Sequence, residues 1–398
     1  MQKDVTSLIH SILNAANRYL KTDGEYAYYV DPVYDIIRNR VNAEICKAMI
    51  RIGDTESVPG IVRYICSTQA PDGSWNEIHP DYDQPSALIT GFIGEALVEA
   101  YDICPKDDVL HKARDYVLRN ELSPGYFLKS EKYTADHLNV DVSCGSFLAK
   151  YGKRFGDKEA IEAAGRAALR TCRFQKVTGE YPYASDQGTY PYPYDIPCVH
   201  YQGVTMYYLS KIQEIIQDPK VDESLLLGAK WLASVQRPDG TFDWSKSGLM
   251  FSYYLSGAYA FAYAAFSCVS KLDKQYEKNA SLSFTGLLRC LHGIMLRWEP
   301  AGWLSLPSAL VTSARSAGIG QFPLREKLFR MGYTMYRQIA RRRYSKTVDP
   351  RFFRKLCSIM RIHPSTIEPF NNFPDMFMTS EVLDCLSYSR QSANTKNR

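Results

Sequence analysis

The segment "DHLNVDVS" (136–143) gathers acidic, imidazole and amide side chains at the predicted start of a helix. His137, Asn139 and Asp141 are its candidates for catalysis, because an imidazole titrates near neutral pH and a carboxyl group can give or take a proton. A structural interpretation stands beside this one: Asp136 or Asn139 caps the helix, since Asp and Asn are preferred at helix N-caps. Residue types alone do not choose between the two.

The segment "YPYPYDIPCVHYQG" (190–203) is the principal candidate site in the sequence. Asp195 and His200 flank the entry into a helix, followed by Tyr201, and an Asp there can fix the tautomer of a histidine base. Alternating Tyr-Pro is extended and stiff. It presents along one edge three rings that suit stacking on a sugar: Tyr190, Tyr192 and Tyr194. The alternative is a packed loop in which His200 caps the helix or bonds a backbone carbonyl.

Two turn segments offer further rings for binding a sugar. "DGSWNEIHPDYDQPS" (72–86) contributes Trp75 and His79, and "QRPDGTFDWSKSG" (236–248) contributes Trp244. The alternatives are a solvated loop and rings packed over their own turns. The His-x-Asp-x-Asp pattern is compatible with a divalent metal, but its spacing does not require one. We predict no metal and no cofactor, because zinc spacing, glycine-rich phosphate loops and nucleophile elbows do not occur.

A turn phrase recurs along the chain. "QAPDGSW" (69–75) returns almost letter for letter as "QRPDGTF" (236–242), with looser copies "NELSPGYF" (120–127) and "QKVTGEY" (175–181). Each glycine precedes an aromatic residue by two positions, and the glycines are 52, 54 and 61 residues apart: Gly73, Gly125, Gly179 and Gly240. A period of this size indicates a repeat of helical hairpins. We expect the four glycines to occupy equivalent turns on one rim.

Apolar residues recur with helical spacing, and convincing alternating strands are not found. The predicted helices are 4–20, 34–52, 58–68, 85–102, 107–120, 138–153, 158–174, 200–216, 222–236, 250–271 and 282–296. A lone hairpin cannot bury its apolar stripe, so the hairpins must stack. Long, unequal loops after the turn phrase favour a closed ring over an open solenoid. The prediction is an all-α toroid of helical hairpins over residues 1–300.

These turns resemble the Gln-…-Gly-x-Trp turn of the α/α-toroid superfamily, which includes terpenoid cyclases and many carbohydrate-active enzymes. Residues 139–169 resemble a segment of unsaturated glucuronyl hydrolases and of uncharacterised toroids among polysaccharide-assembly proteins. Residues 192–209 resemble the helix entry of those uncharacterised toroids. The resemblance covers about residues 30–270. In glucuronyl hydrolases an Asp at this helix entry protonates the substrate, which implies that role for Asn139 or Asp141 here.

Composition and cysteine content indicate a cellular location. The 398 residues are 45% apolar, and neither a signal peptide nor an apolar span is found. The ten cysteines are scattered, as expected for free thiols in a reducing compartment. We therefore expect a cytoplasmic protein, peripheral to a membrane if its basic segment binds one.

The C-terminal segment is basic. Residues 325–361 carry a local charge of +10, against −5 for the rest of the chain. We predict a basic helical extension over 301–398. Its amphipathic pattern suits an anionic membrane surface or anionic glycan better than nucleic acid, and the alternative is a lid neutralising the acidic body.

Three functions remain open at this point. The first is an enzyme that hydrolyses, eliminates or C5-epimerises an acidic or lipid-linked glycan. The second is a terpenoid-cyclase-like enzyme, which the lack of its acid motif disfavours. The third is a toroid that binds a glycan or partner protein without catalysis.

Overall fold

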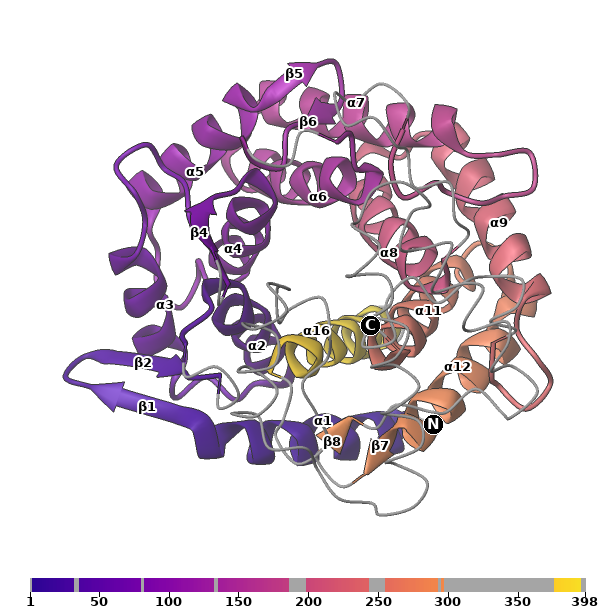
Figure 1. Ribbon diagram of the computed structural model, residues 1–398, viewed down its shortest axis with the longest axis horizontal. Helices are drawn as coiled ribbons and strands as arrows, with labels where there is room; N and C mark the ends of the chain where they lie inside the picture. The colour runs from indigo at the N-terminus through magenta and orange to yellow at the C-terminus, as the bar shows by residue number, and fades with distance from the viewer. Residues whose placement is uncertain are drawn as a thin grey trace, which may run out of the picture.

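The structure is a computed structural model that describes residues 2–31, 36–79, 82–131, 135–185, 198–242, 255–292, 295–296 and 376–394. Six helices form an inner ring in Figure 1: α2 (Asn39–Ile52), α4 (Ala87–Glu99), α6 (Leu138–Phe155), α8 (Val199–Ile216), α11 (Leu255–Val269) and α16 (Met376–Asn394). Six others surround it: α1 (Gln2–Ala16), α3 (Val58–Ser67), α5 (Asp107–Arg119), α7 (Lys158–Phe174), α9 (Pro219–Ser234) and α12 (Glu277–Cys290). The predicted all-α toroid is confirmed.

Four short antiparallel hairpins join these helices in the described part of the chain. They are β1 (Leu20–Asp23) with β2 (Tyr26–Tyr29), β3 (Asn76–His79) with β4 (Tyr82–Pro85), β5 (Glu121–Ser123) with β6 (Tyr126–Phe127), and β7 (Leu291–His292) with β8 (Met295–Leu296). The first predicted helix therefore ends earlier than expected, since residues 20–23 pair as a strand. Two short 3₁₀ turns complete the elements: η1 (Asn17–Tyr19) and η3 (Lys274–Tyr276).

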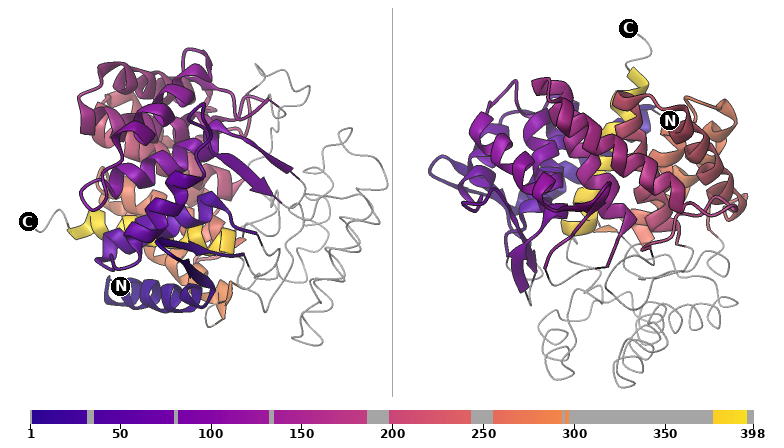
Figure 2. Two further views of the ribbon diagram at one scale, coloured as in Figure 1. Left: turned by 90° about the vertical axis from the view of Figure 1, so that its left-hand side faces the viewer. Right: turned by 90° about the horizontal axis from the view of Figure 1, so that it is seen from above.

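The ring is closed by the two ends of the chain. Helix α16 packs between α2 and α11 in the inner ring, and α1 covers it from outside. Figure 2 shows α16 running through the thickness of the ring, its C-terminal end on the side away from the β3–β4 hairpin. Sequence analysis placed residues 376–394 in an extension, but they form the sixth inner helix. The basic segment 325–361 lies outside the described residues.

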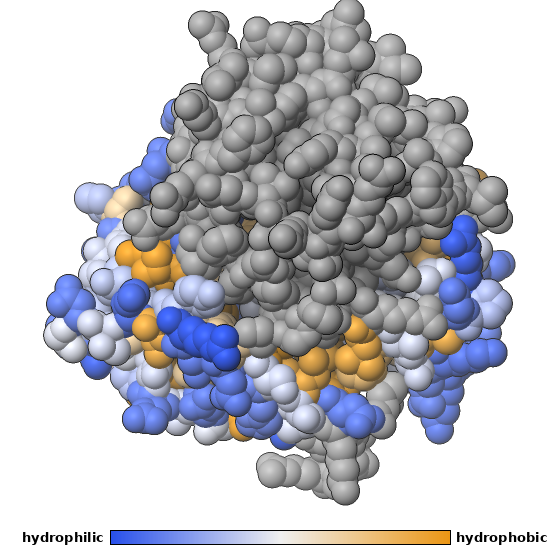
Figure 3. All heavy atoms as spheres, turned by 60° about the horizontal axis from the view of Figure 1, so that its bottom comes forward, coloured by the Kyte–Doolittle hydropathy of each residue, from blue (hydrophilic) through white to orange (hydrophobic). Residues whose placement is uncertain are grey.

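The outer helices are amphipathic, as their position requires. In α7 the buried face is a run of alanines at helical spacing: Ala160, Ala163, Ala164, Ala167 and Ala168. Polar residues cover most of the described surface on the face shown in Figure 3, and apolar residues form small patches there. No helix within the described ranges is long and apolar enough to cross a bilayer.

The repeated turns dock each hairpin onto the next. All four turn glycines have positive φ, between 80° and 98°, as the left-handed conformation of such a turn requires. Each turn lies against a main-chain carbonyl of the next outer helix: Lys112, Arg166, Leu227 or Leu282. A Cβ added to Gly179 would lie 2.2 Å from the Leu227 oxygen. The expectation of equivalent turns is confirmed.

The glutamine that opens the phrase bridges the same two units. Gln175 Nε2 donates to the carbonyls of Gly179 (3.0 Å) and Ser224 (2.9 Å), the second of which lies in α9. Gln69 makes the matching bonds to Gly73 and to Val109 in α5. One side chain therefore satisfies a carbonyl of its own turn and one of the neighbouring helix, which fixes the spacing between repeats.

The aromatic residue that ends the phrase is tied to the following inner helix. The backbone N–H of Trp75 donates to Thr90 Oγ1, that of Phe127 to Asp141 Oδ1, and that of Tyr181 to Gln202 Oε1, at 2.8–3.0 Å. The N–H of Tyr29 likewise donates to Asn42 Oδ1 at 2.7 Å. Each acceptor is the fourth residue of its helix. Side chains at this position therefore point to the outer layer.

We predict that Gly179→Ala lowers the free energy of unfolding by at least about 3 kcal/mol, because the methyl group meets a main-chain oxygen and φ is 98°. Gly156→Ala is the matched control: its φ is 70°, with no atom within 4 Å of an added Cβ. That variant should lose only about 1 kcal/mol. Equal losses in chemical denaturation would show that the close approach contributes nothing.

Candidate functional site

Helix position decides which side chains reach the toroid axis. Residues two apart on an α-helix point in directions about 200° apart. In α2, α4, α6 and α8 the fourth residue bonds the outer layer, so the second residue faces the axis, and we take the same position in α11 and α16. The second residues are Arg40, Leu88, Asn139, His200, Ser256 and Phe377. Four polar side chains thus share one rim, Arg40, Asn139, His200 and Ser256, and the sequence had singled out Asn139 and His200.

Arg40 is held on the axis by contacts from three inner helices. Its guanidinium lies between the rings of Phe92 and Phe377, 4.3 Å and 4.5 Å from the two centroids. Nε donates to Glu44 at 2.9 Å, and Nη2 donates to Glu381 of α16 at 2.5 Å. The side chain retains 12% exposure. Such packing fixes the plane of the guanidinium, and with it the direction from which a further anion can approach.

His200 lies beside Arg40 in a buried environment. It is 4% exposed, and its ring makes edge contacts with Tyr201 and Phe261, with centroids 5.0 Å and 5.4 Å away. Burial and the positive charge of Arg40 lower the pKa of His200 to about 3. The imidazole is therefore neutral at physiological pH, which is the form that can accept a proton.

His137 is joined to His200 through two tyrosines. The ring centroids are 4.6 Å apart for His137 and Tyr183, and 4.1 Å apart for Tyr183 and Tyr201, which contacts His200. Burial, with a smaller effect of Lys129, lowers the pKa of His137 to about 3. The two predicted histidines therefore lie on the same rim, at the starts of neighbouring helices.

Asp141 faces away from this rim cluster. Its Oδ1 accepts from the Phe127 N–H, and its Oδ2 accepts from Arg170 of α7 at 2.8 Å. Asp136 shares Arg170 and also accepts from the Ser185 hydroxyl. Burial and the charge of Asp136 raise the pKa of Asp141 well above its usual range, although Arg170 opposes them. With no exposed surface, Asp141 joins hairpins together, and Asn139 takes the axial position.

The remaining predicted residues divide into two groups. Trp75 is wholly buried and its indole N–H donates to Ile65 O at 2.8 Å, so it has the packing role and no face for a sugar. The backbone of His79 lies in β3. The others lie outside the described residues: Tyr190, Tyr192, Tyr194, Asp195 and Trp244.

A network of buried charges lies beneath the rim cluster, along the axis. Glu95 accepts from Lys150 and Lys211, each at 2.6 Å, and lies 3.9 Å from Lys47. Asp384 of α16 pairs with Lys47 and Arg51, each at 2.8 Å. Burial opposes ionisation of Glu95, but the three lysines outweigh it and hold its pKa well below the usual range. Both carboxylates stay charged inside the toroid.

Neither this network nor Arg40 was predicted from the sequence, although the residue pattern of α2 points to both. Arg40, Glu44, Lys47 and Arg51 are spaced at i, i+4, i+7 and i+11, so they form a single stripe along one helix face. On a solvated helix such a stripe is ordinary. In the structure the four side chains are between 0% and 12% exposed. This burial shows that the stripe faces the inside of the ring.

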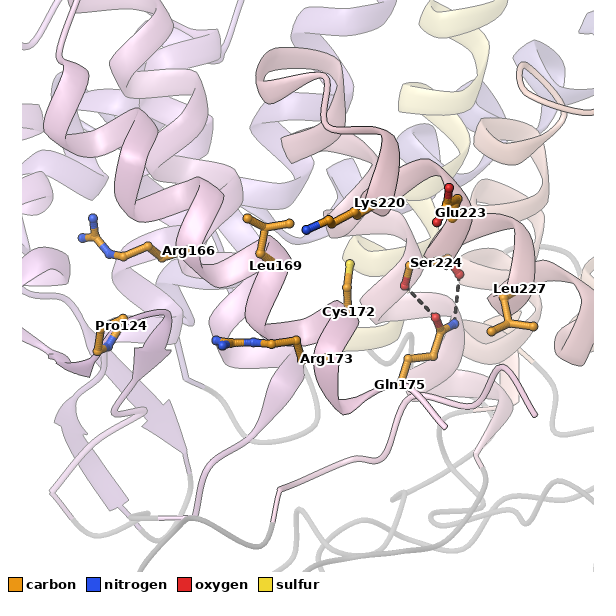
Figure 4. Close-up of a pocket in the computed structure, with 10 residues that line it drawn as sticks. All are labelled: Pro124, Arg166, Leu169, Cys172, Arg173, Gln175, Lys220, Glu223, Ser224 and Leu227. Atoms are coloured by element: carbon orange, nitrogen blue, oxygen red, sulfur yellow. Dashed lines mark hydrogen bonds between the residues drawn. The ribbon is translucent and has the colours of Figure 1, made fainter. Parts of the chain in front are cut away.

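A groove on the outer wall lies away from this cluster. It has a volume of about 580 Å³ between α7 and α9, and Arg166, Arg173 and Lys220 are among its lining residues. Figure 4 shows Gln175 at its edge, bonded to Ser224 as the turn docking requires. The groove follows from the contact between two repeats, and no predicted site residue lines it.

Solved structures share the ring of paired helices. A GH76 α-mannanase from Bacteroides thetaiotaomicron has a TM-score of 0.58 at 10% identity, covering 99% of this chain and 98% of that one. The chain has the α/α-toroid fold. An unsaturated glucuronyl hydrolase specific for heparin has a TM-score of 0.57 at 12% identity, over 100% and 98% of the two chains. The toroid architecture predicted from the repeated turns is thus the one that these two solved structures share.

A shorter match extends the range of similar toroids. A cellobiose 2-epimerase from Bacillus thermoamylovorans B4167 has a TM-score of 0.55 at 8% identity, over 71% of this chain and 87% of that one. No family model and no curated protein matches the sequence. At such identities the likeness shows the fold alone, so function must be argued from the site.

We predict that Glu95→Gln lowers the free energy of unfolding by about 3–5 kcal/mol, because three buried lysines lose their shared carboxylate. Glu214→Gln is the control: Glu214 is 46% exposed, and its pair with Lys271 should be worth less than about 1 kcal/mol. Chemical denaturation measures both variants. If Glu95→Gln lost as little unfolding free energy as Glu214→Gln, the charges along the axis would have to be well solvated.

Stability should fall as pH drops from 7 to 5. The folded pKa of His137 and of His200 is below the unfolded value of about 6.5, so the unfolded state binds protons first. Each histidine should cost about 2 kcal/mol by pH 5, above the range in which carboxylates titrate in the unfolded chain. His200→Gln should remove the part of that loss that comes from His200, about 2 kcal/mol by pH 5. Because the raised pKa of Asp141 acts in the opposite direction, the decisive comparison is between the two proteins: the same change in stability from pH 7 to 5 in the wild type and in His200→Gln would contradict the pKa shift of His200.

Proposed function

We propose that this chain is a carbohydrate-active enzyme that removes the proton next to the carboxylate of an acidic glycan, as a lyase or C5-epimerase. The observation that carries the proposal is the neighbouring pair on the axis: a neutral His200 and the charged, stacked Arg40. Such a reaction needs a base and a cation that neutralises the substrate carboxylate. The two side chains meet both needs from adjacent places on one rim.

The chemistry assigns each residue a role. Arg40 binds the uronate carboxylate, and His200 takes the proton from the adjacent carbon, whose electron pair moves into the carboxylate. Return of a proton to the opposite face, from a donor across the sugar from His200, gives the epimer. Expulsion of the neighbouring glycosidic oxygen instead gives elimination. Asn139 faces the same axis and binds a sugar hydroxyl.

Hydrolysis is less well supported by the described residues. The carboxylate that the resemblance offered as an acid, Asp141, is directed to α7 and Arg170. The axial position two residues earlier holds Asn139, which cannot give up a proton as a carboxylic acid does. The similar solved toroids include a glucuronyl hydrolase and an epimerase, and the proposal takes from them a saccharide substrate rather than a mechanism.

Two finer parts of the proposal concern where the enzyme meets its substrate. We propose that the glycan is lipid-linked or otherwise part of polysaccharide assembly, and that the basic segment 325–361 binds an anionic membrane surface beside it. The local charge of +10 supports this. A cytoplasmic location fits the scattered cysteines, of which the eight whose side chains are described are free thiols.

Deuterium exchange tests the reaction class directly. The protein is incubated in D₂O with glucuronate-containing oligosaccharides, and mass spectrometry and NMR follow deuterium at C5 and the appearance of unsaturated ends. We expect exchange, and His200→Ala should abolish it while shifting Tm by only a few degrees. His111→Ala, which removes an imidazole from outer helix α5, is the matched control and should keep the activity.

Three results would argue against the proposal. Exchange that survives His200→Ala would assign the base elsewhere. Release of reducing ends without exchange at C5 would mean hydrolysis. Binding of the oligosaccharide with neither exchange nor cleavage would support the non-catalytic toroid.

A further inference from the structure

The groove on the outer wall carries two exposed basic side chains that make no ion pair within the described ranges. It lies between α7 and α9, and its volume of about 580 Å³ is typical of a small-molecule site. The two side chains are Arg173, in the last turn of α7, and Lys220, in the first turn of α9. Arg166 lines the same groove, but it is paired with Glu121 at 2.7 Å. Arg173 and Lys220 are therefore the cations that a ligand can engage.

The walls of the groove combine these charges with apolar surface. Figure 4 shows Lys220 pointing from α9 toward Leu169 of α7, while Arg173 points toward Pro124. Among the lining residues the carboxylate is that of Glu223, which in this view lies on the side of Lys220 away from Arg173. A uronate sugar has an apolar ring face and a carboxylate, and the planar arginine fork binds a carboxylate through two hydrogen bonds. The groove offers a partner to each part of such a sugar.

The two cations are not needed to dock one repeat on the next. Two other turns open with a glutamine that bonds a carbonyl of the following outer helix, as Gln175 bonds that of Ser224. Counted from these contacts, the positions of Arg173 and Lys220 hold uncharged residues in both turns: Ser67 and Pro105 in the first, Ser234 and Gln275 in the last. The docking contact is thus made without a basic residue at either place.

We propose that this groove is a second glycan-binding site, which holds a carboxylate-bearing stretch of an acidic polysaccharide on the outer wall, away from the rim cluster. The proposal takes the class of saccharide from the proposed function and adds a second place where the chain binds it. One cation comes from each helix, which suits a polymer whose charges are spaced along its length. Because the chain outside 325–361 carries a charge of −5, an acidic polymer is attracted to this part of the protein only at local basic sites.

Labelling of Cys172 reports on the groove without any turnover. This partly exposed thiol lines the groove, and the partly exposed Cys66 takes the equivalent position, three residues before Gln69, outside it. Burial raises the pKa of both thiols, that of Cys66 to about 11, so labelling by an uncharged thiol reagent is slow and is followed over hours by mass spectrometry.

The probe is a glucuronate-containing oligosaccharide, added to the full chain. At about ten times its Kd, we expect labelling of Cys172 to slow about tenfold while that of Cys66 is unchanged. A neutral glucose oligosaccharide of the same length should protect neither thiol. An unprotected Cys172, or protection by inorganic phosphate at the same concentration of charge, would overturn the proposal, the second by showing a site for simple anions.

A double variant tests the two cations. Arg173→Gln with Lys220→Gln should raise the Kd obtained from protection of Cys172 at least about tenfold, because two contacts with carboxylates are lost. The matched control is Lys230→Gln with Lys278→Gln, which removes two exposed lysines from the neighbouring helices α9 and α12 and should leave that Kd unchanged. Equal weakening in the two double variants would mean attraction by general charge and would contradict the proposal.

Exchange at C5 separates this inference from the proposed function. Arg173→Gln with Lys220→Gln should leave kcat on a short oligosaccharide unchanged, because the groove lies away from the rim cluster. If Cys172 is protected but no exchange occurs, the groove is assigned correctly and the proposed reaction is wrong. Exchange without protection of Cys172 would show the reverse.

Discussion

The balance of charge along the toroid axis is the constraint on which the rest of the structure depends. Inner helices contribute five basic and five acidic side chains that pair with one another: Arg40, Lys47, Arg51, Lys150, Lys211, Glu44, Glu95, Glu99, Glu381 and Asp384. Each would be costly to bury alone. Removal of α2, α4, α6, α8 or α16 would leave opposite charges unpaired, whereas α11 contributes none of these charges. This requirement gives α16, remote in sequence from α2, its fixed place beside that helix.

The pairing of buried charges also supports the rim that holds Arg40, Asn139 and His200. Ion pairs fill the lower axis and offset the cost of burying their charges. At the rim the inner helices begin, and there Arg40, which is itself paired with Glu44 and Glu381, lies beside the neutral His200. His200 remains neutral because it is buried and, in second place, because the positive charge of Arg40 lies near it. The residues proposed to act on a substrate thus lie at the helix starts, above the paired charges of the axis.

Repetition determined how much the sequence could predict. The turn phrase recurs. Its glycines make the same contact in four hairpins, its aromatic residues in three and its glutamines in two, so the helices and the ring followed from their spacing. Helix α16 lacks the phrase, and nothing local in residues 376–394 distinguishes an inner helix from an extension. Arg40 and Glu381 are 341 positions apart. Their pairing depends on closure of the ring, which no local pattern records.

Within a single short segment, helix position separated structural residues from candidates for chemistry. Asn139 and Asp141 are two residues apart, and the sequence offered both for one role. The fourth position of four inner helices is occupied by Asn42, Thr90, Asp141 and Gln202, unlike side chains that all accept the N–H of the preceding aromatic residue. A position that tolerates any acceptor serves the fold. The second position has no such common contact. There the chain places an arginine, an asparagine, a histidine and a serine beside a leucine and a phenylalanine, so this position is not committed to docking the outer layer and is where the proposed chemistry is placed.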